Sequence, residues 1–165
     1  MIFSNELSHG PGPAGLHGAS GSKTMTLYAF LLSIHVIGAI LGLGQVVGIA
    51  VVASSSRATP SPIGPQTWEL LRILVQGTTA GLITMMVTGV LIEWSLGGPY
   101  HDFWWFRVSF FELLALGAIH ARTRVALRQR DTLEEQATLR GIARRAWVMC
   151  LLIAATTVLM ETKPF

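Results

Sequence analysis

The chain has 165 residues, of which 51% are hydrophobic and 13% are charged, and its mean hydropathy is +0.53. This composition excludes an ordinary water-soluble domain and favours a single membrane domain with several spans. The formal net charge of +3 is small, and the single cysteine, Cys150, excludes an internal disulfide and any CxxC metal or redox motif.

The N-terminal segment differs in composition from the rest of the chain. It is rich in Gly, Pro and Ser and contains no apolar stretch like that of a cleavable signal peptide. This composition predicts a flexible tail over residues 1–24 and a membrane domain over residues 25–165.

Four apolar stretches predict an all-α, polytopic membrane protein with four transmembrane helices in a bundle. The longer stretches cover the ~30 Å of a hydrocarbon core at about 1.5 Å per residue. A proline-rich loop follows the first stretch and GGPYHD ends the second, whereas the polar segment before the fourth is either a hairpin connection or a surface helix. The predicted spans are residues 25–53, 68–96, 102–127 and 146–160.

The arginines predict the orientation of these spans. Two of them, Arg57 and Arg72, flank the first loop, and only Lys23, Arg107 and Lys163 lie toward the opposite side. By the positive-inside rule both termini are non-cytoplasmic, in a bacterial-type cytoplasmic (inner) membrane. Because topology accounts for the charge, nucleic acid is not an expected partner. The remaining arginines lie between the third and fourth spans: Arg122, Arg124, Arg128, Arg130, Arg140, Arg144 and Arg145.

His35 is the first candidate functional residue, because it lies in the apolar first span. Gly38 and Gly42 follow it by three and seven positions, on one helical face, and let a flat macrocycle or another helix approach closely. A buried ionisable group in a membrane is a functional candidate by default. One interpretation is therefore a haem iron ligand with the glycines making room for the porphyrin, and the other is a hydrogen bond across a packed helix pair.

His120, in the third span, is a second candidate metal ligand. We place His35 about 15 Å and His120 about 27 Å into spans that run in the same direction. An offset of about 12 Å does not suit two axial ligands of one iron. The alternative for His120 is an interfacial histidine, since Arg122 and Arg124 are close to it in sequence.

Arg107 and Glu112 are the candidate catalytic residues, because both carry charge inside the third span. A buried arginine needs an anion, and the choices are Glu112, Glu93, Asp102 or a ligand carboxylate such as a haem propionate. Glu112 lies near mid-span, where it is a candidate proton carrier or quinone contact. The alternatives are that Arg107 extends to the headgroups and that Glu112 hydrogen-bonds a neighbouring helix.

Four segments resemble a known group of membrane proteins: FLLSIHVIGAILGLGQVVG, MMVTGVLIEW, FWWFRVSFFELLALGAIHAR and the terminal KPF. They are similar to segments of the HemJ-like protoporphyrinogen oxidases and of the related copper-resistance-D-like and other four-helix membrane families. The resemblance covers residues 25–165. It implies a four-helix bundle, often with a b-type haem on the first-helix histidine, here His35.

Two departures from the HemJ-like pattern concern the active site. A lysine of those enzymes near the start of the third helix corresponds to Arg107 here, and arginine stays protonated and cannot ligate iron. The fourth span also has no NExP segment. Both departures disfavour protoporphyrinogen oxidation, but they leave the fold and haem binding as expectations.

The sequence therefore predicts an integral membrane protein that binds haem b through His35 and has a redox role. If it is an enzyme, it is an oxidoreductase that uses haem b. The alternative is a non-catalytic accessory or scaffold protein, or a small-solute transport module of the copper type, and the lesser alternative is a HemJ-like oxidase. The expected partners are the lipid bilayer, a quinone or electron-transfer protein, and a second copy in a homodimer, since small-residue faces favour helix association.

Overall fold

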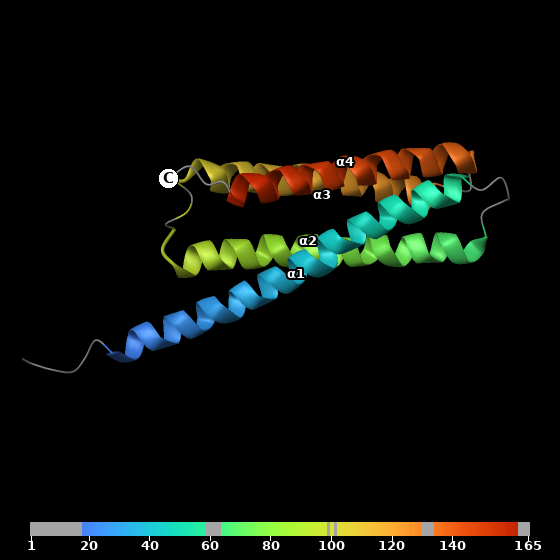
Figure 1. Ribbon diagram of the computed structural model, residues 1–165. Coiled ribbons are helices and arrows are strands. Elements are labelled where there is room, and N and C mark those ends of the chain that lie inside the picture. Colours follow the sequence, from blue (N-terminus) through green and yellow to red (C-terminus); the bar gives the residue numbers. More distant parts are fainter. Residues whose placement is uncertain (1–17, 59–63, 99, 101, 130–133, 162–165) are drawn as a thin grey trace, which may run out of the picture.

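The structure is a computed structural model that describes residues 18–58, 64–98, 100, 102–129 and 134–161. Its regular structure over these residues is entirely helical. The four helices are α1 (Gly18–Ala58), α2 (Pro65–Ser95), α3 (Trp104–Arg128) and α4 (Glu135–Glu161). Successive helices run in opposite directions (Figure 1).

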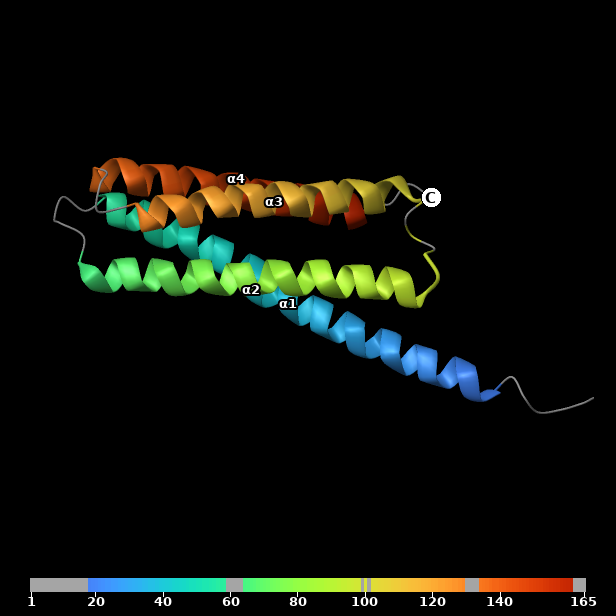
Figure 2. The same ribbon diagram turned by 180° about the vertical axis from the view of Figure 1, so that it is seen from behind.

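The helices fall into two pairs that meet at one end of the molecule. α1 packs along α2, and α3 packs along α4 and, less extensively, on α2. The C-terminal half of α1 also packs on α4, whereas its N-terminal half diverges from α3 and α4 in both views (Figures 1 and 2). Within the described residues α1 and α3 are not in contact. The end with the N-terminal half of α1 is therefore the more open one.

Most of the buried apolar core lies at the opposite, closed end. There Val46, Ile49, Ala50 and Ala53 of α1 pack against residues of α2 and α4 in one continuous cluster. The indole Nε1 of Trp147 donates a hydrogen bond to Ser54 Oγ at 3.1 Å, which further ties α4 to the end of α1.

The ends of α2 follow from its flanking residues. Pro65 occupies the first turn, where its missing N–H costs no helical hydrogen bond. At the other end Gly97 and Gly98 have φ values of 78° and 77°, a left-handed conformation that glycine adopts without strain. Their amides donate to the carbonyls of Trp94 and Glu93 at 3.1 and 2.9 Å. α2 thus ends just before this glycine pair.

Three helices begin earlier than the predicted spans, α2 by three residues and α1 and α4 by more. Most of the predicted tail, residues 1–17, lies outside the described residues, but residues 18–24 belong to α1. α4 begins at Glu135, well before the predicted start of the fourth span at residue 146. The polar segment from Glu135 onward is helical because apolar side chains recur on one face and pack against the rest of the protein. The buried ones are Leu139, Ile142, Ala143, Ala146 and Met149.

Three of the helices are long and apolar enough to cross a membrane. The segments are Met25–Ser56, Pro65–Ser95 and Glu135–Val158. Large apolar side chains such as Ile40, Ile83 and Leu151 are 58–70% exposed along them, as expected where lipid is the solvent. α3 is not among the three. Arg107, Glu112 and the arginines near its end lower its hydropathy, so composition alone does not support the predicted third span.

Candidate functional site

His35 lies at the α1–α2 contact and is bonded to α2. Its Nδ1 is 2.8 Å from Thr88 Oγ1, and the Thr88 hydroxyl donates its single hydrogen to Thr84 O at 2.6 Å. Thr88 therefore accepts from the imidazole, which places the ring hydrogen on Nδ1 and leaves the lone pair on Nε2. The ring rests against Gly89, where a Cβ would lie 3.6 Å from His35 Cε1. This is the hydrogen bond across a packed helix pair that one interpretation of the sequence predicts.

His120 makes a similar contact from α3, but with the other ring nitrogen. Its Nε2 is 2.9 Å from Thr79 Oγ1, whose hydroxyl donates to Val75 O at 2.9 Å. By the same argument Nε2 carries the hydrogen and Nδ1 keeps a lone pair. His120 is 3% exposed, and Nδ1 has no partner among the described residues. His120 is thus buried in the contact between α2 and α3.

Both histidines are hydrogen-bonded to threonines of α2, at positions far apart on that helix. Thr79 and Thr88 are nine residues apart on one helix, which corresponds to about 13 Å along the axis. Two imidazoles bonded at these positions do not meet at one metal ion. Neither threonine was predicted from the sequence. Each hydroxyl donates to the carbonyl four residues earlier in its own helix, Thr88 to Thr84 and Thr79 to Val75, which is a common arrangement in helices.

The glycines near His35 pack against protein. A Cβ on Gly42 would lie 2.7 Å from Gly81 Cα, and a Cβ on Gly38 would lie 2.9 Å from Thr84 Cγ2. These are closer than side-chain carbons approach other atoms, so the space beside both glycines is filled by α2. The face expected to make room for a porphyrin therefore forms the seam between α1 and α2.

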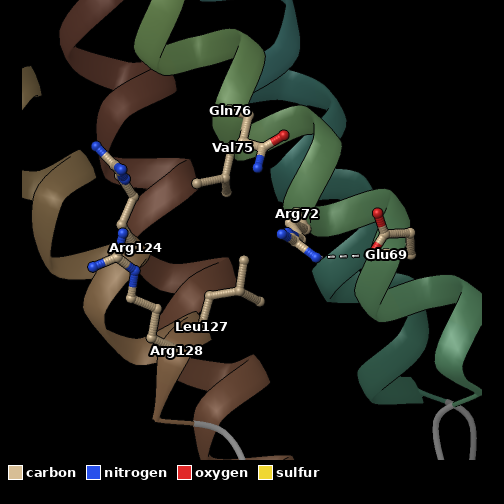
Figure 3. A pocket seen from close by; sticks show the side chains of 7 residues that line it. All are labelled: Glu69, Arg72, Val75, Gln76, Arg124, Leu127 and Arg128. Carbon is tan, nitrogen blue, oxygen red and sulfur yellow. Dashed lines mark ion pairs between the residues drawn. The ribbon is translucent and has the colours of Figure 1, made fainter.

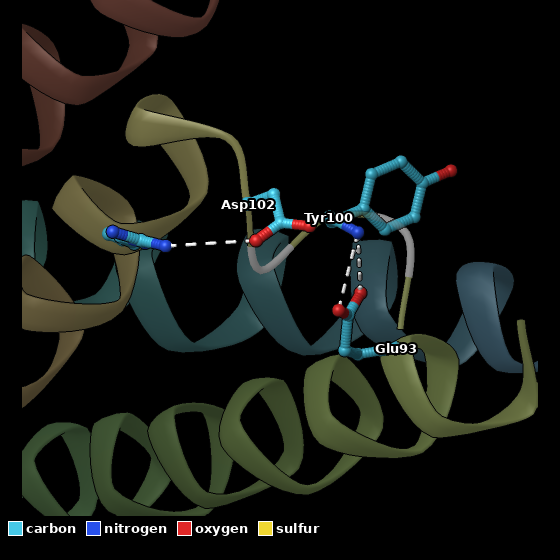
Figure 4. Close-up of polar contacts among 4 residues, drawn as sticks. Glu93, Tyr100 and Asp102 are labelled. Atoms are coloured by element: carbon cyan, nitrogen blue, oxygen red, sulfur yellow. Dashed lines mark hydrogen bonds and ion pairs between the residues drawn. The ribbon is translucent and has the colours of Figure 1, made fainter. Parts of the chain in front are cut away.

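Arg107 lies at the start of α3 with an acidic neighbour. Its Nη2 is 3.8 Å from Asp102 Oδ1, and the two side chains are 61% and 78% exposed (Figure 4). Asp102 is thus the anion, out of those considered, that the structure places beside Arg107. Glu93 instead accepts the backbone N–H of Tyr100 at 3.2 Å with both carboxylate oxygens.

Glu112 lies near the middle of α3 and is partly buried. Its Oε1 is buried and has no hydrogen-bond partner among the residues that the structure describes. Because α1 and α3 are not in contact, neither Glu112 nor Arg107 is brought together with His35 on touching helices. The candidate site residues therefore do not form one cluster in this arrangement.

Metal-ligating side chains are also dispersed. Over the described ranges no group of three or more His, Cys, Asp or Glu side chains could hold a metal ion. Cys150 is a free thiol of intermediate burial on α4.

In comparisons with known proteins, no family model, no curated protein and no solved structure matches the chain. The resemblance to HemJ-like and copper-resistance-D-like proteins accordingly stays a prediction.

Proposed function

We propose that the protein crosses a cytoplasmic (inner) membrane four times, with α3 as the fourth crossing and both termini on the non-cytoplasmic side. Three helices qualify as spans by length and composition. α3 begins near the end of α2 and ends near the start of α4, at the closed end of the molecule. Its 25 residues cover about 37 Å. The arginines at the closed end favour a cytoplasmic location for the two connections there.

We further propose a non-catalytic function, as an accessory or scaffold protein whose polar intramembrane groups hold its helices together. The observation that carries this proposal is that both histidines are hydrogen-bonded to threonines of α2. Polar groups that bond across helices stabilise membrane proteins because lipid offers no other partner. The filled glycine seam supports the same function, since Gly38 and Gly42 are used within one chain. A homodimer through other faces stays a prediction.

Haem b binding at His35 is the second candidate, and one observation favours it. Donation from Nδ1 leaves Nε2 with the lone pair, which is the arrangement of a metal-ligating histidine whose other nitrogen is held by a protein acceptor. The ring nitrogen fits a haem iron, but the expected glycine cradle does not, because α2 fills it. A bound haem would supply one-electron chemistry, and a quinone or electron-transfer partner would be expected with it.

Absorption spectra separate the two candidates. The protein is expressed with a haem precursor, purified in detergent, and measured oxidised and dithionite-reduced, together with His35→Asn and His35→Ala. The Asn side-chain nitrogen lies about where Nδ1 lies, so Asn keeps the bond to Thr88 and removes Nε2. The accessory function predicts a colourless wild type and a loss of stability in His35→Ala that is smaller in His35→Asn. A Soret band with sharp reduced bands, lost in both variants, would instead establish the haem.

A further inference from the structure

A cavity of about 320 Å³ lies between α2 and α3 at the closed end of the molecule. In Figure 3 Val75 and Leu127 lie between the two helices, with arginines on both sides. The residues that line it include Glu69, Arg72 and Val75 from α2 and Arg124, Leu127 and Arg128 from α3.

The charges around this cavity are not balanced. Arg72 Nη1 is 3.7 Å from Glu69 Oε2, so one arginine is partly compensated. Neither Arg124 nor Arg128 has an ion pair with any residue that the structure describes. Three guanidinium groups and one carboxylate leave a charge of +2 (3 − 1) around the cavity. Such an arrangement favours an anion of charge −1 to −2, and guanidinium groups bind phosphate oxygens in pairs.

The depth of the cavity matches that of lipid headgroups. Arg128 is the last residue of α3, Arg124 lies one turn before it, and Arg72 is about 10 Å from the start of α2. Thr79 lies four residues after Val75 on α2, and His120 lies four residues before Arg124 on α3. Both are therefore about one helical turn further from the closed end. These two residues are hydrogen-bonded to each other and close the α2–α3 contact at that level. On α2 the apolar Val75 thus lies about one turn deeper than Arg72, whereas on α3 Leu127 lies next to Arg128 at the helix end.

We propose that this cavity binds the anionic, phosphate-bearing headgroup of a membrane phospholipid. Arg124 and Arg128 donate to the phosphate oxygens, Leu127 contacts the glycerol at the same level, and Val75, which lies deeper, contacts the first acyl carbons. Val75 is 4% exposed and Leu127 is partly buried, so the apolar part is built into the helix contact. Basic pockets between membrane helices on the cytoplasmic side recognise anionic headgroups by this chemistry.

Inorganic phosphate shares the headgroup's chemistry, but it would leave Val75 and Leu127 without a contact. A lipid uses both parts of the cavity, which is why we assign the site to a lipid. The two sources differ in a direct way: phosphatidylglycerol presents phosphate joined to hydrocarbon, whereas inorganic phosphate presents the charge alone.

Native mass spectrometry of the full-length protein in detergent, titrated with phosphatidylglycerol, phosphatidylcholine or inorganic phosphate, tests the assignment. The pocket variant Arg124→Gln/Arg128→Gln is compared with Arg122→Gln/Arg140→Gln, which removes the same charge from exposed arginines outside the cavity. We expect the phosphatidylglycerol dissociation constant to rise about thirtyfold in the pocket variant, about fivefold per arginine. The control variant should stay within about twofold of wild type.

A gain of binding guards against a variant that merely fails to fold. Glu69→Gln frees Arg72 from its ion pair, and we expect it to bind phosphatidylglycerol about fivefold more tightly. Equal losses in the pocket and control variants would overturn the proposal in favour of diffuse surface charge. Equal affinity for phosphatidylcholine, or binding of inorganic phosphate without a preference for phosphatidylglycerol, would overturn the lipid assignment.

Discussion

Gly42 of α1 and Gly81 of α2 meet backbone to backbone, so that a Cβ on Gly42 would lie 2.7 Å from Gly81 Cα. α1 crosses α2 at an angle (Figure 1), and the close contact shows that the two backbones touch at these glycines. His35 lies seven residues before Gly42, and Thr88 lies seven residues after Gly81. Because the helices are antiparallel, these two residues lie about 10 Å from the crossing in the same direction. The close glycine contact thus sets the distance that the His35–Thr88 hydrogen bond spans.

We expect Gly42→Ala and Gly81→Ala each to destabilise the protein by about 1–3 kcal/mol, because an added methyl group forces two backbones apart. Gly44 is the matched control on the same helix. A Cβ there would meet nothing within 4 Å, so Gly44→Ala should be neutral or slightly stabilising. Free energies of unfolding in mixed detergent micelles measure the difference. Equal stability of Gly42→Ala and Gly44→Ala would show that the crossing is not tight.

We expect the two histidines to differ in whether Asn or Gln is the less destabilising replacement. His35 bonds through Nδ1 and His120 through Nε2, and the nitrogens of Asn and Gln lie near these two positions respectively. We therefore expect His35→Asn to be more stable than His35→Gln, and His120→Gln to be more stable than His120→Asn. Each difference should be about 0.6 kcal/mol and at most about 1.7 kcal/mol, the range of hydrogen bonds between membrane helices.

Thermal unfolding of the four purified variants measures these differences. Thr88→Val and Thr79→Val remove the acceptors, and in those backgrounds the preference for one amide should disappear. The same order of Asn and Gln at both histidines would contradict the assigned ring nitrogens.

The fold was largely predictable from local sequence. Long apolar runs predict helices, and the glycine pair at 97–98 predicts where α2 ends. The start of α4 was not fixed by the sequence, which left its polar first turns as either a hairpin connection or a surface helix. Only a tertiary contact shows that Leu139 and Ile142 are buried and so belong to the helix.

The candidate site was predictable only in part. The sequence shows that Gly38 and Gly42 share a face with His35, but it does not show what fills that face, because the partner lies on another helix, α2. The same holds for Thr88, whose hydroxyl becomes the acceptor for His35 only once the helices cross. The arginines of the cavity were assigned to topology, since their charge is visible in the sequence and their common location is not.

Glu135 is expected to stabilise the closed end through its contact with α2. Its Oε1 accepts a hydrogen bond at 2.8 Å from Nε1 of Trp68, which is 6% exposed. Glu135→Ala should cost about 1–3 kcal/mol, the range for a hydrogen bond to a charged group, and Glu135→Gln should cost less because it keeps the acceptor. Glu134→Ala, at the exposed neighbouring position, is the control in the same unfolding experiment. A loss equal to that of the control would show that the Trp68 contact adds no stability.

Tyr100, in the connection between α2 and α3, is expected to ionise at unusually high pH. Partial burial raises the pKa of its hydroxyl above the ordinary value, and the Tyr28 side chain and the Glu93 carboxylate add to this effect. All three disfavour the negatively charged tyrosinate, so the direction is upward. The chain has two tyrosines, and Tyr28→Phe leaves Tyr100 as the single one to follow by its ultraviolet absorbance.

In that background Tyr100 should titrate above about 10, the value of a solvated tyrosine. Adding Glu93→Gln should lower the midpoint, because it removes a negative charge and keeps an oxygen that can accept the Tyr100 backbone N–H. Glu69→Gln, near the other end of α2, removes the same charge far from Tyr100 and should leave the midpoint unchanged. A midpoint that Glu93→Gln does not lower would mean that this carboxylate has no electrostatic effect on the tyrosine, and that burial accounts for the shift that persists without Tyr28.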